Sequence, residues 1–189
     1  MRITGGRLKN RSVSVVDRPG LRPTSARVRE AVFHVLGTRL EGARVWDAFG
    51  GSGILSFEAW SRGAQVVVCT ERDRRAVRQI SATAAGLGAE IDVRARDARR
   101  VPERGFDVIF ADPPYDDTPA RWISVLSSAL APDGVMVFEH RSGKLTRGRH
   151  GALRVTWQRK YGDTTVSFLS FNGCDSGDEE GTDAFLLES

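Results

Sequence analysis

From Arg44 onward the chain alternates short apolar runs with longer amphipathic segments, and this alternation restricts the possible folds more than any other feature. We predict strands at 44–47, 66–70, 91–95, 106–111 and 135–139. Three of them are nearly continuous apolar runs, as is typical of strands covered on both faces. Segments with apolar residues at helical spacing lie at 54–62, at 73–87 and from Thr118 onward. The pattern predicts an α/β fold with a doubly wound, mostly parallel sheet.

The two ends of the chain extend this core. Residues 153–160 and 164–171 predict two strands joined by Gly162-Asp163, a hairpin that adds an antiparallel edge and makes a seven-stranded sheet. We expect a basic N-terminal β appendage at 1–24, and a main domain at 25–171 that begins with a helix at 25–39. The acidic tail at 172–189 is expected to be disordered.

Charge is distributed unevenly along the chain. The net charge is +4, but the tail carries six acids and no Lys or Arg, so residues 1–171 hold 28 basic and 18 acidic groups. Residues 1–29 alone contain eight basic side chains and one acid. This distribution favours a polyanionic partner, although a charged surface also serves solubility. The residues expected to contact such a partner are Arg7, Lys9, Arg11, Arg22, Arg27 and Arg29.

Composition argues against an exported, membrane-spanning or metal-binding protein. No apolar run approaches the roughly 20 residues that cross a membrane, and the N-terminus has no apolar signal segment. Cys69 and Cys174 have no metal-ligand spacing, and Glu139-His140 has no further ligand at a useful distance in sequence. We expect a cytoplasmic, monomeric protein without a metal ion.

A glycine-rich loop, Asp47-Ala48-Phe49-Gly50-Gly51-Ser52-Gly53, follows the first predicted strand. Glycines between a strand and a helix let a ligand approach the backbone and leave amides free at the helix N-terminus. The dinucleotide-binding pattern Gly-x-Gly-x-x-Gly is not met, because its third glycine position is Ser56. The loop therefore disfavours NAD without excluding it.

Three acids at or near strand ends narrow the choice of ligand. We expect Glu71 to accept ribose hydroxyls, Asp47 to hold an ammonium group and Asp97 to accept from an adenine amino group. S-adenosylmethionine has these three groups and no phosphate, so it fits better than a dinucleotide. A helix cap is the alternative role for such acids. The expected cofactor contacts are Asp47, Phe49, Gly51, Gly53, Glu71, Asp97 and Ala98.

A second motif, Asp112-Pro113-Pro114-Tyr115, follows the fourth predicted strand. Two prolines fix φ near about −65° and remove amide donors, so carbonyl groups face a ligand there. An acceptor at Asp112 and an aromatic face at Tyr115 suit a flat base held by its amino group. The alternative is a rigid turn with Tyr115 in the core. A base inside a duplex cannot reach such a pocket, so the target base should be unpaired or flipped.

These motifs resemble class I S-adenosylmethionine-dependent methyltransferases, and more narrowly the bacterial small-subunit ribosomal RNA guanine-N2 methyltransferase family known as RsmD. The similarity covers residues 2 to about 171, and its most specific part is Arg22-Pro23-Thr24-Ser25. The family's usual Asp-Leu-Phe-Ala-Gly-Ser-Gly reads Asp-Ala-Phe-Gly-Gly-Ser-Gly here, and the acidic tail is outside the family pattern. Other matching segments are Arg2 to Gly6, Val28 to Ala31, Glu58-Ala59, Ser61 to Ala64 and Tyr161 to Asp163.

The resemblance implies methyl transfer from S-adenosylmethionine to the exocyclic N2 of a guanine in 16S ribosomal RNA, with Asp112, Pro113 and Tyr115 as catalytic residues. The partner would be ribosomal RNA or the small ribosomal subunit, either assembled or as an intermediate. Two alternatives stay open: amino-group methylation of adenine or cytosine in DNA, and a ribosome-assembly factor that binds RNA without activity. The intact acids of both motifs argue against the second alternative.

Overall fold

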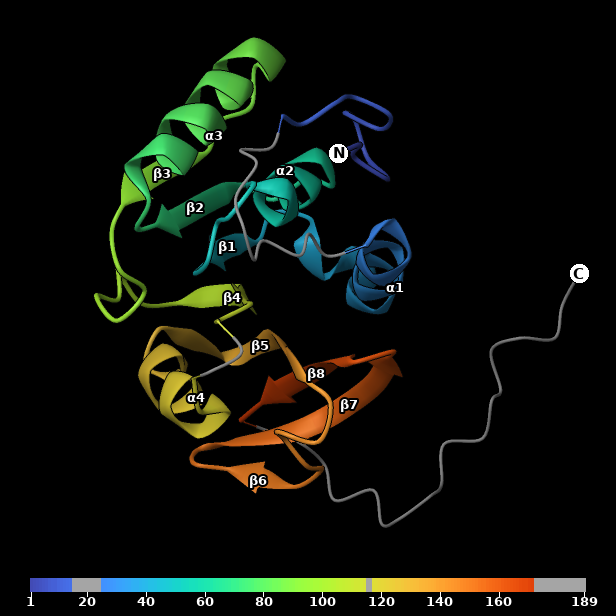
Figure 1. Cartoon of the computed structure of the whole chain (residues 1–189), viewed down its shortest axis with the longest axis vertical. Helices are drawn as coiled ribbons and strands as arrows, with labels where there is room; N and C mark the ends of the chain where they lie inside the picture. The colour runs from blue at the N-terminus through green and yellow to red at the C-terminus, as the bar shows by residue number, and fades with distance from the viewer. Residues whose placement is uncertain (15–24, 115–116, 172–189) are drawn as a thin grey trace, which may run out of the picture.

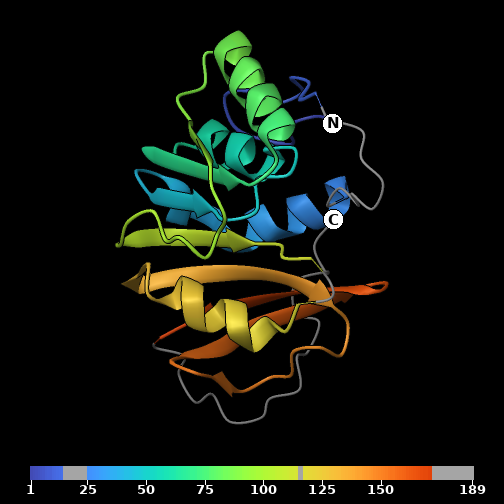
Figure 2. The same ribbon diagram turned by 60° about the vertical axis from the view of Figure 1, so that its left-hand side comes forward.

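The structure, a computed structural model, describes residues 1–14, 25–114 and 117–171. One eight-stranded sheet runs through the molecule in the order β3-β2-β1-β4-β5-β8-β7-β6, with helices on both faces (Figures 1 and 2). The parallel strands are β1 (Arg44–Asp47), β2 (Val66–Glu71), β3 (Asp92–Ala95), β4 (Phe106–Ala111) and β5 (Leu130–Arg141). The antiparallel edge contains β8 (Thr164–Ser170), β7 (Leu153–Tyr161) and β6 (Arg149–His150).

The helices are α1 (Ala26–Leu36), α2 (Ile54–Ser61), α3 (Arg74–Leu87) and α4 (Pro119–Ser127). Ser25 caps α1 by accepting from the Val28 amide, and Asp73 caps α3 in the same way. Helices α1 and α2 share a buried cluster with β1, β2 and β4, whereas α4 packs on the other face. The predicted doubly wound α/β fold is therefore confirmed.

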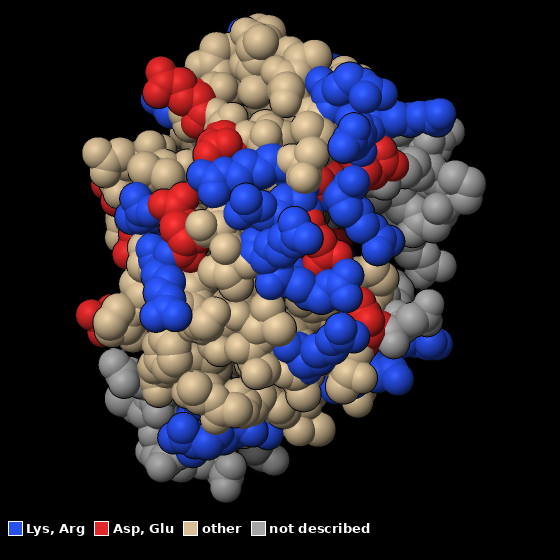
Figure 3. Space-filling view, turned by 90° about the vertical axis from the view of Figure 1, so that its left-hand side faces the viewer, with Lys and Arg blue, Asp and Glu red and all other residues tan. Residues whose placement is uncertain are grey.

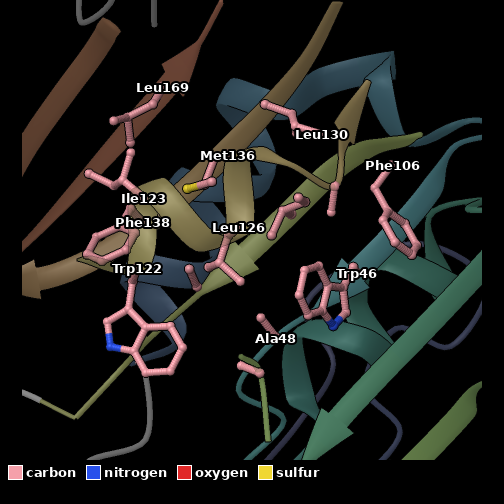
Figure 4. Packing of buried hydrophobic residues seen from close by; sticks show 14 of the residues in the cluster. Trp46, Ala48, Phe106, Trp122, Ile123, Leu126, Leu130, Met136, Phe138 and Leu169 are labelled. Atoms are coloured by element: carbon pink, nitrogen blue, oxygen red, sulfur yellow. The ribbon is translucent and has the colours of Figure 1, made fainter. Parts of the chain in front are cut away.

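The cluster under α4 holds the two central strands in place. Trp46 and Phe106 pack together at 5.8 Å between ring centroids, and Leu126 of α4 belongs to the same cluster (Figure 4). The Trp46 indole also donates to the Thr70 hydroxyl at 3.1 Å. This packing fixes the positions of β1 and β4, whose carboxyl ends carry the two predicted motifs.

Three details differ from the sequence predictions. The sheet has an eighth strand, β6, which is only two residues long and has no detectable sequence pattern. The first helix ends at Leu36 and continues as the 3₁₀ helix η1 (Gly37–Leu40), because Gly37 adopts a φ of 52°. Residues 1–14 form a loop closed by a single bridge between Arg2 and Ser12, where we had predicted a β appendage.

That N-terminal loop is part of the core. Ile3, Leu8 and Val13 are buried in a cluster with residues of α2 and α3. Bends and turns occupy residues 5–10, so the Arg2–Ser12 bridge is the only β pairing among the described residues of this loop. The predicted contacts Arg22 and Tyr115, and the acidic tail, lie outside the described residues.

Within the described ranges, no helix combines the length and the apolar character needed to cross a membrane. The same part of the chain contains no cluster of three or more His, Cys, Asp or Glu side chains suited to a metal ion.

Candidate active site

The parallel strand order brings the acids of both motifs to one edge of the sheet. Strand β1 lies between β2 and β4, and Asp47 aligns with Cys69 and Phe110 on these neighbours. Glu71 and Asp112 are each two residues further along their own strand direction, so all three acids meet at the carboxyl ends. The chain also reverses its winding direction between β1 and β4, which is where open α/β sheets bind ligands.

Asp47 is a buried acid that has hydrogen bonds but no cation. Its exposed fraction is 2%, and it accepts from the Ser56 hydroxyl at 2.7 Å and from the Phe49 amide. None of the ion pairs among described residues includes it. Burial raises the pKa of Asp47 from 3.8 to about 6, against the lowering effect of these hydrogen bonds, and the nearby Glu71 raises it further.

Ser56 is a site residue that the sequence reasoning missed. It had served only to argue against a dinucleotide, whereas in the structure it orients Asp47 from the first turns of α2. Its spacing of nine residues from Asp47 is too long to be recognised without the strand–loop–helix geometry.

The glycine-rich loop is fixed by Glu71. One carboxylate oxygen of Glu71 accepts from the Gly51 amide and the other from the Asp73 amide, both at 2.8 Å. Gly53 has a φ of 76°, which favours glycine, and begins α2. A Cβ atom at Gly50 would lie 2.6 Å from the Cys69 sulfur, so the loop packs closely on β2 at this position.

Asp97 and Ala98 follow β3 at the same edge of the sheet. Asp97 is half-buried and accepts from the Arg99 side chain at 2.9 and 2.7 Å. These hydrogen bonds lower the pKa of Asp97 to about 2. An open cavity of about 550 Å³ lies here, lined by Ala95, Arg96, Asp97, Arg99 and Arg100. Asp97 is thus placed beside a cavity, as expected for a ligand contact, but it already holds an arginine.

Asp112 and Pro113 lie directly after β4. Asp112 is half-buried and Pro113 is buried. Burial raises the pKa of the Asp112 carboxyl well above its usual range, and the negative charges of Glu139 and then Asp47 add to the shift. The end of β4 therefore carries a carboxylate that binds protons more readily than an ordinary one.

Phe49 is held by an aromatic contact with α4. Its ring meets Trp122 edge to face at 4.8 Å between centroids. The Trp122 indole donates to Asp117, which follows the Asp-Pro-Pro segment, at 3.1 Å. The loop after β1 and the loop after β4 are thereby joined through side chains.

The basic N-terminal residues divide into different environments. Arg7, Lys9, Arg11 and Arg27 are exposed. The guanidinium of Arg7 lies 3.4 Å from the centroid of Trp60 and donates to the Trp60 carbonyl at 3.0 Å. It is therefore held against the C-terminal end of α2.

Arg29 does not belong to an RNA-contacting surface, so that prediction was wrong. Its exposed fraction is 3%, and it pairs with Glu58 at 3.3 Å and donates to the Arg2 carbonyl at 2.8 Å. Glu58 is fully buried and also accepts from Arg62 and from the Thr4 amide. This Glu58 network joins the N-terminal loop and α1 to α2.

The strand order, the loop after β1 and the Asp-Pro-Pro segment after β4 define a class I methyltransferase fold. Over residues 1–170 the chain matches the family described as "Conserved hypothetical protein 95". The chain belongs to this family, the RsmD family.

Individual relatives agree with this assignment. The chain is 32% identical to YlbH of Bacillus subtilis over 184 residues, which is 92% of this chain and all of the relative. It is 34% identical to the Escherichia coli "Ribosomal RNA small subunit methyltransferase D" over 119 residues, 61% of this chain and 60% of that protein. The solved structure of Escherichia coli yhhF has a TM-score of 0.81 and 28% identity, with 92% of this chain and 99% of that chain covered.

Proposed function

We propose that this protein transfers a methyl group from S-adenosylmethionine to the exocyclic N2 of a guanine in 16S ribosomal RNA. The observation that carries the proposal is the half-buried Asp112 carboxylate beside Asp47 and the glycine-rich loop. The name of the Escherichia coli relative, a small-subunit ribosomal RNA methyltransferase, supports the RNA class of substrate.

The chemistry of the donor set fits S-adenosylmethionine. Asp47 and Glu71 put two buried carboxylates around the loop, and no Lys or Arg among the described residues pairs with Asp47. An ammonium group of a ligand would supply the missing positive charge, and a ribose would share the oxygens of Glu71. Asp97 and Ala98 would meet the adenine, and Phe49 and the backbone of Gly51 and Gly53 would complete the site. When bound, the cofactor supplies an electrophilic methyl group on a sulfonium.

Asp112 provides the acceptor that an amino-group substrate needs. The lone pair of a guanine amino nitrogen is delocalised into the ring, which makes it a poor nucleophile. If Asp112 accepts one N–H and the Pro113 carbonyl accepts the other, the nitrogen moves toward tetrahedral geometry and its lone pair is freed. The raised pKa of Asp112 also suits it to receive the proton that the amine loses. Tyr115 would stack on the base.

The test is a transfer assay with tritiated S-adenosylmethionine on small ribosomal subunits, free 16S ribosomal RNA and DNA of matched length. We expect label in RNA as N2-methylguanosine, and a loss of at least about 100-fold in Asp112→Asn with unchanged cofactor affinity in calorimetry. Label in DNA alone would favour adenine or cytosine methylation. Absence of both cofactor binding and label would favour an assembly factor without activity.

A further inference from the structure

Four exposed arginines lie around the cavity at the carboxyl end of β3. We call them the Arg96 surface, and they are Arg72, Arg96, Arg99 and Arg100. Arg72 follows β2, and its charge lowers the pKa of Asp97 at the cavity. Figure 3 views the side of the molecule that carries α3 and β3, where Lys and Arg side chains gather in a band across the face.

The Arg96 surface carries more positive charge than the described acidic residues neutralise through ion pairs. Asp97 pairs with Arg99 at 2.7 Å, whereas none of the ion pairs among described residues includes Arg72, Arg96 or Arg100. The neighbouring Arg94 behaves differently, because it pairs with two acids, Asp92 and Glu103. Three of its four arginines therefore have no acid partner among the described residues and can bind an external anion.

The proposed cofactor does not explain this charge. S-adenosylmethionine contains no phosphate and carries an ammonium and a sulfonium, so several guanidinium groups beside its adenosine would repel rather than attract it. A polyanion that passes next to the cofactor site would use them. Guanidinium groups are well suited to phosphate because their planar fork can donate two hydrogen bonds.

The position of the Arg96 surface also fits the substrate. The Arg96 amide donates to the Glu71 carbonyl at 3.0 Å, which places Arg96 just beyond the strand ends. Strand β3 is three strand spacings from β4, about 14 Å from the Asp112 side of the edge. Arg7, in contrast, is bound at the last turn of α2, at the end of that helix that points away from the carboxyl edge of the sheet.

We propose that the Arg96 surface binds the phosphate backbone of the RNA strand that carries the target base. This inference rests on the proposed function, because it assigns the substrate grip for the same site. It moves the main RNA contact from the N-terminal loop to residues 96–100, directly after β3. A sequence signal exists for it: residues 96–100 contain three arginines against one acid.

The test compares two variants with the same change in charge. Arg96→Glu/Arg100→Glu alters the proposed surface. Arg39→Glu/Arg104→Glu alters two exposed arginines at the opposite edge, in η1 and before β4, which belong to no ion pair among the described residues. Binding of radiolabelled 16S ribosomal RNA is measured between 50 and 300 mM KCl, roughly the range in which phosphate contacts dominate. Methyl transfer to small subunits from a deletion strain and cofactor affinity by calorimetry are measured in parallel.

We expect Arg96→Glu/Arg100→Glu to weaken RNA binding roughly 30-fold at about 100 mM salt and to reduce the salt slope by about 1.5 to 2. Cofactor affinity should not fall, because these arginines repel rather than attract the cationic cofactor, and the control variant should bind RNA within about threefold of wild type. Equal weakening in both variants, or none in either, would overturn the proposal. If wild type binds RNA through this surface but transfers no methyl group to any RNA, the surface stands and the proposed function fails.

Discussion

Two buried carboxylates lie at helix α2, and they differ in whether a described cation pairs with them. Glu58, which is part of the helix, is fully buried and holds Arg29 and Arg62. Asp47, which accepts from Ser56 on the same helix, is almost as deeply buried and pairs with no described cation. The first acid has its counter-charges inside the protein, whereas the second is left for a charge that comes from outside.

This difference separates structural charge from functional charge. Burying an unpaired carboxylate costs free energy, and a protein keeps one where a ligand later compensates for it. The same distinction applies to the arginines: Arg29 pairs with Glu58 inside the fold, whereas Arg96 and Arg100 are exposed and belong to no ion pair among the described residues. Pairing within the fold, more than the number of charged residues in a segment, indicates which of them face a ligand.

We expect the largest effect on stability from a change to Glu58, the buried carboxylate that is paired with arginines. Glu58→Gln would remove the carboxylate that pairs with buried Arg29, and loss of one partner of a buried pair costs about 3–5 kcal/mol. We expect the free energy of unfolding, measured by urea denaturation, to fall by about 3 kcal/mol. Cofactor affinity at a temperature where the variant is folded should stay near wild type. A loss below about 1 kcal/mol would show that the Glu58 network does not stabilise the fold.

The next prediction concerns Asp47, whose ionised form lowers the free energy of unfolding where Glu58 raises it. The folded pKa of Asp47 is about 6 against 3.8 in the unfolded chain, so ionised Asp47 destabilises the cofactor-free protein at pH 7 by about 3 kcal/mol. Because the folded pKa is the higher one, the contribution of Asp47 to stability is present below about pH 4 and is lost as the pH rises through about 6.

Asp47→Asn should therefore be more stable than wild type at pH 7, by up to about 3 kcal/mol, and should bind cofactor more weakly. Urea denaturation of both proteins from pH 4 to pH 8 should show the difference growing through roughly the interval between pH 4 and 6. A variant that is less stable than wild type at every pH would contradict the view that Asp47 is held there for a ligand.

The smallest effect tests the exposed N-terminal arginine. Arg7→Ala removes a cation–π contact with Trp60 at the surface, which is worth about 0.5–1 kcal/mol of stability. We expect RNA affinity to fall by less than about threefold, far less than for the Arg96 surface. A tenfold loss would return the main RNA contact to the N-terminal loop.

The sequence predicts those features of the structure that are set by short segments of the chain, and it misses contacts between residues far apart in sequence. The alternation of apolar runs with amphipathic segments predicted the α/β fold, and acids at the ends of predicted strands indicated the edge where Asp47, Glu71 and Asp112 lie. The environment of Arg29 depends on Glu58, 29 residues away, and could not be deduced from charge composition. Ser56 was missed for the same reason, since its role exists only once the loop brings it to Asp47.

The N-terminal loop shows how tertiary packing overrides a weak strand pattern. The sequence predicts a β appendage at 1–24, but the apolar residues Ile3, Leu8 and Val13 insert into the cluster with α2. Backbone and side-chain groups of α2 then accept hydrogen bonds from amides of the loop. For example, the Ser61 carbonyl accepts from the Arg7 amide at 2.8 Å. A second strand was not needed.

Mass spectrometry of nucleosides from 16S ribosomal RNA tests the proposed methyl transfer to guanine N2 most directly. It compares a strain that lacks this protein with the same strain carrying wild type or Asp112→Ala. We expect one N2-methylguanosine to be lost in the deletion strain, to be restored by wild type and not to be restored by Asp112→Ala, although this variant still binds S-adenosylmethionine. An unchanged N2-methylguanosine content in the deletion strain, or its restoration by Asp112→Ala, would contradict this function.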